Sequence, residues 1–182
     1  MTRIALTGNI ASGKSAVSEI LKQKGFEVLD TDDVSHKLLT VKNKELFDVF
    51  KDYDVFENGE FSRVKLGKLI FNDEILRKKL EAILHPQIAQ EIEKFDGIVA
   101  IPLLFEAKME YLFDKIIMVY TDDGIRLDRL MKRNNFTEAE AKARMNSQIP
   151  QDEKISLCDF VIYNNGSLEN LKSSVETIFK QV

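Results

Sequence analysis

One stretch near the start of the chain constrains the fold more than any other. Residues 8–15 read G-N-I-A-S-G-K-S, which matches the G-x-x-x-x-G-K-[ST] pattern of a phosphate-binding loop. An apolar segment, residues 4–7, precedes it, and residues 16–21 continue with helical spacing. This order predicts a strand, a loop and a helix, so that loop N–H groups and the positive end of the helix face phosphate oxygens. A chance glycine turn would not require all of these features, so the pattern predicts a nucleoside triphosphate site.

Two side chains of the loop have predicted roles in that site. Lys14 can reach the β- and γ-phosphates, and the Ser15 hydroxyl can ligate Mg²⁺. The composition does not favour a larger anionic ligand, because a net charge of −4 gives no general attraction for nucleic acid or an anionic membrane. No apolar stretch approaches the ~20 residues of a membrane span. We therefore expect neither nucleic acid nor membrane as a partner.

The remaining composition predicts an ordinary globular protein. The 182 residues are 44% hydrophobic and 31% charged, which suits one domain. The single cysteine, Cys158, excludes an internal disulfide and suits a reducing cytoplasm, where we expect it to be a buried structural thiol. The oligomeric state stays open and is compatible with a monomer.

Apolar segments alternate with helical ones along the chain, which predicts an α/β fold: a phosphate-loop kinase-like parallel five-stranded sheet with helices on both faces. The predicted strands are residues 3–7, 26–29, 97–104, 115–120 and 159–163. In such sheets ligands bind beyond the carboxyl ends of the strands, so we expect the site there.

Two long connections interrupt this alternation. Residues 32–95 predict helices around 33–40, 43–50, 63–71, 73–84 and 86–95, with a loop over 52–59, and suggest an acceptor-binding insertion. Residues 122–157 predict helices near 122–134 and 137–147, the second begun by a Thr137–Glu140 capping box, and suggest a basic lid. The core would then comprise 1–31, 96–121 and 158–182, with an amphipathic helix over 167–182.

Acidic residues after the second strand point to phosphoryl transfer. The chain has neither a D-x-x-G switch nor an N/T-K-x-D guanine-reading motif, which weighs against a nucleotide-dependent switch. Asp32 can accept the proton of an attacking hydroxyl, while Asp30, nearer the strand, can fix the loop or a water on the metal. Alternatively, Thr31-Asp32-Asp33 caps the next helix.

Basic residues in the second insertion can supply the positive charge that the moving phosphoryl group needs. Arg126, Arg129 and Arg133 are spaced i, i+3, i+7 and share one helix face. That face is either a solvated basic surface or a set of guanidinium groups that close on ATP phosphates, with Arg129 as the first candidate.

Nearly end to end, the chain resembles the dephospho-coenzyme A kinase family. The resemblance is carried by a series of short motifs whose order and spacing are specific together. They are Leu6-Thr7-Gly8 before the loop, Val28-Leu29-Asp30-Thr31-Asp32, Phe61-Ser62-Arg63, Leu69-Ile70-Phe71, Leu84-His85-Pro86-Gln87-Ile88, Ile101-Pro102-Leu103-Leu104-Phe105-Glu106, Arg129-x-x-x-Arg133, Arg144-x-x-x-Gln148 and Val161-Ile162-Tyr163-Asn164-Asn165-Gly166.

The resemblance implies transfer of the ATP γ-phosphoryl group, with Mg²⁺, to the ribose 3′-hydroxyl of dephospho-coenzyme A. It implies three sets of site residues. Catalytic roles fall on Asp32, Lys14 and Arg129; ATP binding on Gly8, Ala11, Ser12, Gly13, Lys14, Ser15, Ala16, Arg133, Arg144, Asn164 and Asn165; acceptor binding on Asp32, Arg63, His85, Leu103 and Glu106. His85 can instead cap a helix that begins at Pro86, and Glu106 can cap the helix after it. A nucleoside or nucleotide monophosphate kinase is the nearest rival.

Four positions depart from the usual pattern of this family. Asn9 and Ala11 stand where Gly is usual, Ala16 where Thr is usual, and Tyr163 where Asp is usual. Asn tolerates the left-handed conformation, whereas Ala11 is expected to keep a negative φ. These changes are expected to affect ATP affinity rather than the reaction.

Overall fold

In the computed structural model, which describes residues 2–181, a parallel five-stranded sheet organises the chain. The strands are β1 (Ile4–Thr7), β2 (Val28–Asp30), β5 (Ile98–Ala100), β6 (Lys115–Tyr120) and β7 (Phe160–Tyr163), in the order β2-β5-β1-β6-β7. Leu6 at the centre pairs with Ala100 on one side and Ile117 on the other. The predicted parallel sheet is confirmed, and Met1 and Val182, which bound the predicted core segments, lie outside the described residues.

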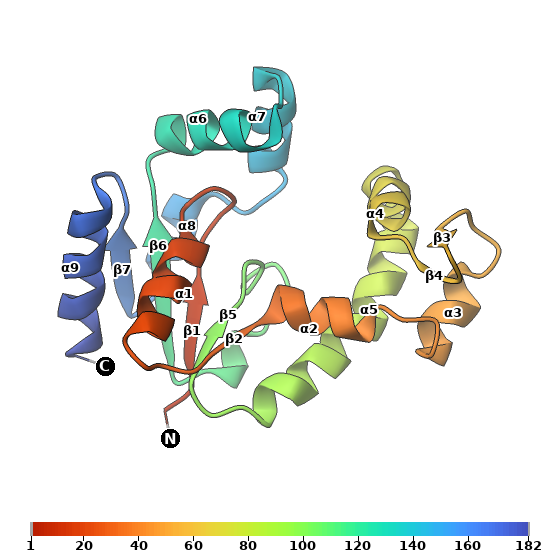
Figure 1. Cartoon of the computed structure of the whole chain (residues 1–182), viewed down its shortest axis with the longest axis horizontal. Coiled ribbons are helices and arrows are strands. Elements are labelled where there is room, and N and C mark those ends of the chain that lie inside the picture. Colours follow the sequence, from red (N-terminus) through yellow and green to blue (C-terminus); the bar gives the residue numbers. More distant parts are fainter. Residues whose placement is uncertain (1, 182) are drawn as a thin grey trace. The chain divides into compact units, whose positions relative to one another are not determined.

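The core forms where two helices cover the sheet. Helices α1 (Lys14–Gln23) and α9 (Leu168–Phe179) pack side by side against the strands (Figure 1). The buried cluster they form with the sheet consists of Leu6, Val17, Ile20, Leu21, Ile98, Ile117, Val119, Ile162, Leu171 and Val175. Burial of these apolar side chains therefore holds α1 and α9 against the sheet.

The chain divides into two compact units. One comprises the chain up to Asp30 together with the chain from Phe95, and the other is Thr31–Lys94. The first unit also contains η1 (Glu110–Leu112), α6 (Asp123–Asn134), α7 (Glu138–Asn146) and α8 (Gln151–Ile155). The capping box of Thr137 and Glu140 at α7 is confirmed. Helix α8 was missed by the sequence reasoning.

The second unit has its own apolar core. It contains α2 (Thr31–Leu38), α3 (Lys44–Phe50), β3 (Phe56–Glu57), β4 (Glu60–Phe61), α4 (Arg63–Asn72) and α5 (Glu74–Glu93). The loop predicted over 52–59 is wrong in part, because β3 and β4 pair as a short hairpin. Asn58 and Gly59 at its tip have φ of 51° and 81°, which is the Asn-Gly signal of a tight hairpin turn.

The break predicted between helices 73–84 and 86–95 is also wrong, because α5 continues through Pro86. A proline inside a helix costs about 3 kcal/mol. Burial of a row of apolar side chains, spaced four residues apart on both sides of the proline, offsets that cost. The row is Leu76, Leu80, Leu84, Ile88 and Ile92. His85 consequently lies within a helix and does not cap one.

Strand β5 is shorter than the predicted 97–104. Pro102 has no N–H to donate to a neighbouring strand. The following segment instead forms turns, in which Ala107 N donates to Leu103 O (2.8 Å) and Met109 N donates to Leu104 O (3.1 Å). No helix within residues 2–181 has the length and apolarity needed to cross a bilayer.

Candidate nucleotide-binding site

Residues 8–13 form a tight loop between β1 and α1, and two glycines are required for its packing. A Cβ at position 8 would lie 2.8 Å from the backbone oxygen of Val119, and one at position 13 would lie 2.1 Å from Asn164 Nδ2. Gly13 also has φ 96°. The expectation of a negative φ at Ala11 is wrong, because its φ is 63° and it adopts the left-handed conformation.

The start of α1 has the properties of an anion site. Gly13 caps the helix without a side-chain hydrogen bond, and the first turn contains no acidic residue. Lys14 is the first residue of the helix, and its Nζ lies 3.9 Å from Asp30 Oδ2 at the end of β2. Ser15 is exposed beside it. Because helix N–H groups and the helix dipole favour negative charge, this end of α1 suits phosphate.

Thr121 and Asn164, which follow β6 and β7, and Arg129 of α6 support the loop from the other side. Ser12 O accepts hydrogen bonds from Thr121 Oγ1 and from Asn164 Nδ2, both at 2.8 Å. Arg129 Nη2 donates to Asn164 O at 3.1 Å, and Arg129 Nη1 lies 3.8 Å from where a Cβ on Gly13 would be. The structure therefore brings Arg129 and Asn164 to the phosphate loop, as two of the predicted site residues.

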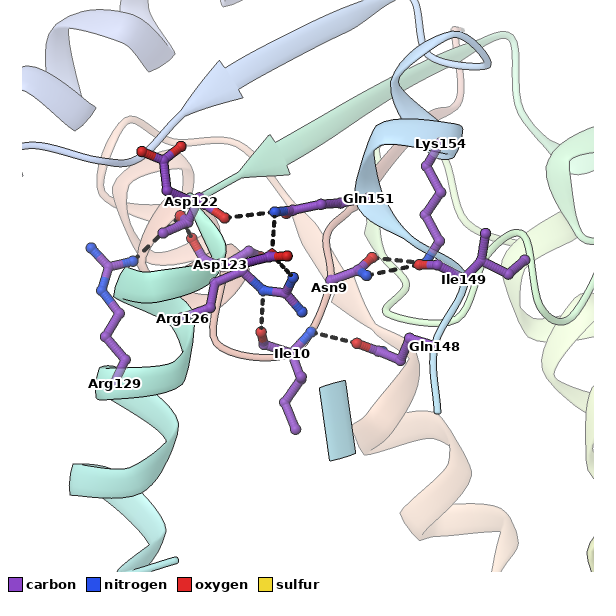
Figure 2. A network of polar contacts seen from close by, with 12 residues as sticks. Asn9, Ile10, Asp122, Asp123, Arg126, Arg129, Gln148, Ile149, Gln151 and Lys154 are labelled. Carbon is purple, nitrogen blue, oxygen red and sulfur yellow. Dashed lines mark hydrogen bonds and ion pairs between the residues drawn. The ribbon is translucent and has the colours of Figure 1, made fainter. Parts of the chain in front are cut away.

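Arg126 behaves differently from the arginines with which it was grouped. Its side chain is buried, with Nε donating to Ile10 O at 3.0 Å and Nη1 donating to Asp123 Oδ1 at 2.7 Å (Figure 2). Gln151 Nε2 donates to the same Asp123 oxygen and to Thr121 O, both at 2.8 Å. The inference that Arg126 shares an open basic face with Arg129 is therefore wrong, and Arg126 instead holds the loop backbone.

A second set of contacts joins the loop to the segment before α8. Ile10 N donates to Gln148 Oε1 at 2.7 Å, and Asn9 Nδ2 donates to Ile149 O at 2.9 Å (Figure 2). Lys154 Nζ donates to Asn9 Oδ1 at 2.8 Å and to Glu106 Oε1 at 2.7 Å. Sequence reasoning missed Lys154, Gln151 and Thr121, because none of them lies in a phosphate-binding pattern.

The other predicted site residues of the first unit lie on its exposed or half-buried surface. Arg133 and Arg144 are exposed on α6 and α7, and Arg133 donates to Asn134. Asn165 exchanges two hydrogen bonds with Asp122, at 2.9 and 2.8 Å. Leu103, in the turn after β5, is 47% exposed.

Three predicted acceptor residues belong to the second unit. Asp32 is exposed in the first turn of α2, where its charge also favours the helix dipole. Arg63 is the exposed first residue of α4, and His85 is half-buried within α5. The chain connection places Asp32 two residues beyond Asp30, the last residue of β2.

Comparison with known proteins identifies the family. A family model described as dephospho-CoA kinase matches residues 2–170. The chain belongs to the dephospho-CoA kinase family. A dephospho-CoA kinase of Carboxydothermus hydrogenoformans is 41% identical over 191 residues, covering 98% of this chain and 93% of that protein.

Two solved structures share the fold over nearly the whole chain, and one of them is a dephospho-CoA kinase. TT1252 from Thermus thermophilus matches with a TM-score of 0.82 and 33% identity, over 100% of this chain and 97% of that one. A dephospho-CoA kinase from Campylobacter jejuni matches with a TM-score of 0.71 and 30% identity, over 98% and 96% of the two chains.

Proposed function

We propose that this protein transfers the γ-phosphoryl group of ATP to the ribose 3′-hydroxyl of dephospho-coenzyme A, giving coenzyme A and ADP, the last step of coenzyme A biosynthesis. The observation that carries the proposal is the phosphate loop, in which a Cβ at either end would lie within 3 Å of a neighbouring atom, in a chain of the dephospho-CoA kinase family. The reaction would take place in the cytoplasm, with ATP and dephospho-coenzyme A as the two substrates.

Binding of ATP would use the first unit. Backbone N–H groups at the start of α1 would hold the phosphates, and Lys14 would place its charge on the β- and γ-phosphates. The Ser15 hydroxyl and the Asp30 carboxylate are oxygen donors of the kind that Mg²⁺ prefers, so they fit this ion at the loop. Bound there, Mg²⁺ would neutralise phosphate charge.

Two further side chains would act directly on the transferred phosphoryl group, and four others would support ATP around it. Asp32 would accept the proton of the acceptor hydroxyl, and Arg129 would stabilise the negative charge that builds on the phosphoryl oxygens. The position of Arg129 beside Gly13 supports that role. Arg133 and Arg144 would add positive charge from the lid, and Asn164 and Asn165 would lie near adenine.

The acceptor would be held by Arg63, His85, Leu103 and Glu106 together with Asp32. The hydrogen bonding of the Glu106 carboxylate supports this assignment. Its Oε1 is bonded to Lys154 and Ile149, whereas its Oε2 is buried without a hydrogen-bond partner among the described residues. A buried carboxylate oxygen is costly unless it accepts a hydrogen bond, and a donor group of the acceptor can supply one.

The test is ADP release by the purified protein with ATP, Mg²⁺ and a panel of acceptors: dephospho-coenzyme A, adenosine, AMP, CMP and shikimate. Among these acceptors, we expect only dephospho-coenzyme A to support turnover. Turnover with a nucleoside or nucleotide and none with dephospho-coenzyme A would replace the proposal by the nearest rival, another small-molecule kinase.

The role of Asp32 has its own variant. Asp32→Asn keeps the size of the side chain and removes its charge, so turnover should fall by about 10²–10⁴-fold while ATP binding persists. Asp30→Asn should lower turnover less. If Asp30→Asn is inactive and Asp32→Asn is fully active, the base is Asp30 and not Asp32.

A further inference from the structure

Lys154 is a buried cation that the proposed reaction does not use. Its side chain is 1% exposed, and the ammonium group is held by Asn9 Oδ1 at 2.8 Å and Glu106 Oε1 at 2.7 Å. Burial of a charge is costly unless the charge is paired and hydrogen-bonded, so this lysine is held in one place. Because it is enclosed, Lys154 cannot act as a surface contact for phosphate.

The partners of Lys154 connect two segments that are far apart in the sequence. Asn9 belongs to the phosphate loop, and its carboxamide accepts from Lys154 while donating to Ile149 O at 2.9 Å. Ile149 N in turn donates to Glu106 Oε1 at 3.1 Å. Asn9, Glu106, Ile149 and Lys154 thus form a closed set of contacts, which we call the loop clamp. Figure 2 shows its Asn9, Ile149 and Lys154 members.

The loop has a reason to need such support. Ala11 is left-handed at φ 63°, a conformation that costs a residue with a side chain about 1–2 kcal/mol. Backbone of this kind persists only where its surroundings over-determine it. The carboxamide of Asn9, two residues before Ala11, fixes the loop at one end, and the Asn164 and Thr121 bonds to Ser12 O fix it at the other.

We propose that Lys154 is a positioning residue for ATP binding: through Asn9 it keeps the phosphate loop in its nucleotide-ready conformation before ATP arrives. A loop that is already ordered does not lose further conformational entropy when the triphosphate binds. The inference rests on the proposed use of ATP but not on the identity of the acceptor. Its effect therefore falls on nucleotide affinity rather than on the chemical step.

The decisive experiment measures ATP affinity without any acceptor. Lys154→Met replaces the ammonium by an apolar side chain. Lys142→Met is the matched control, since Lys142 is exposed on α7 and pairs with Glu138 one turn earlier in the same helix. Calorimetric titration with a non-hydrolysable Mg²⁺–ATP analogue should show Kd raised about tenfold or more for Lys154→Met and unchanged within twofold for Lys142→Met. Turnover with ATP and the acceptor both saturating should change less than threefold, because Glu106, the other partner of Lys154, is assigned to acceptor binding and not to the chemical step.

A double-mutant cycle separates positioning from general destabilisation. Asn9→Ala alone should also raise Kd for the analogue, and adding it to Lys154→Met should raise Kd little further, because the two residues act through one contact. Additive effects, a Kd for Lys154→Met equal to that of Lys142→Met, or a fall in kcat with unchanged Kd would each overturn the proposal.

The inference stays testable if Lys154→Met does not fold. Asn9→Ala then decides it by two readouts on the nucleotide-free protein and its complex: Kd for the analogue and hydrogen exchange of the loop amides. We expect weaker binding together with faster exchange at residues 9–13 in the free protein. Unchanged exchange would show that the clamp does not order the loop.

Discussion

Ala11→Gly should stabilise the protein, which is an unusual outcome for introducing a glycine. The left-handed φ of 63° costs alanine about 1–2 kcal/mol, and glycine adopts it without that cost. Glycine loses more conformational freedom on folding, which costs about 0.5–1 kcal/mol. The difference is a net gain of up to about 1.5 kcal/mol, or a rise in Tm of a few degrees for a chain of this size.

The assay is urea and thermal unfolding of Ala11→Gly against wild type, with Ala143→Gly as the control. Ala143 is an exposed residue inside α7 of the same unit, where glycine should cost about 0.5–1 kcal/mol. The free energy of unfolding should rise for Ala11→Gly and fall for Ala143→Gly. If Ala11→Gly lowers the free energy of unfolding as much as Ala143→Gly does, the left-handed backbone at Ala11 is not a source of strain.

Other variants test other parts of the structure. Lys14→Ala should cost about 3 kcal/mol of transition-state stabilisation, which is a fall of about a hundredfold in kcat/KM, while the circular dichroism spectrum stays unchanged. Near-normal turnover would show that the loop does not bind the phosphates of ATP. The Lys115 ammonium and the Ile116 N–H lower the pKa of Asp159. The folding stability that Asp159 contributes is therefore fully present above its unfolded-state pKa of about 4 and is lost as pH falls through its lower folded-state pKa. Asp159→Asn should therefore lower the free energy of unfolding by about 1 kcal/mol at pH 7 and by less at pH 3 in urea titrations, whereas an equal loss at both would contradict the pairing. Burial, with the neighbouring Asp159 charge, raises the pKa of Cys158 to about 11, so iodoacetamide should modify the folded protein slowly at pH 8; a rate equal to that of the unfolded chain would show an open thiol.

The parts of the fold predictable from sequence are those fixed by local patterns. The five strands are short runs rich in apolar residues, and the phosphate loop has the pattern of a strand–loop–helix unit. The capping box at α7 was predictable for the same reason, because Thr137 and Glu140 lie three residues apart.

The parts that sequence reasoning missed depend on packing or on long-range contacts. Whether Pro86 ends a helix is decided by the apolar row of α5 that continues past it, and not by the proline itself. Ala11, with its left-handed φ, lies between Ile10 and Ser12, whose backbone groups are bonded to Gln148, Thr121 and Asn164, all more than a hundred positions away. Lys154 meets Asn9 across 145 positions of sequence, so no local pattern could have paired them. The Asn58-Gly59 hairpin signal, by contrast, was present in the sequence and was overlooked.

The central claim is most directly tested by identifying the product formed from dephospho-coenzyme A. The purified protein would be incubated with Mg²⁺ and ATP carrying ¹⁸O-labelled γ-phosphate, and the product analysed by mass spectrometry and ³¹P NMR. We expect one labelled phosphoryl group on the ribose 3′-hydroxyl and one equivalent of ADP. An unmodified acceptor, or a label at any other hydroxyl, would contradict it.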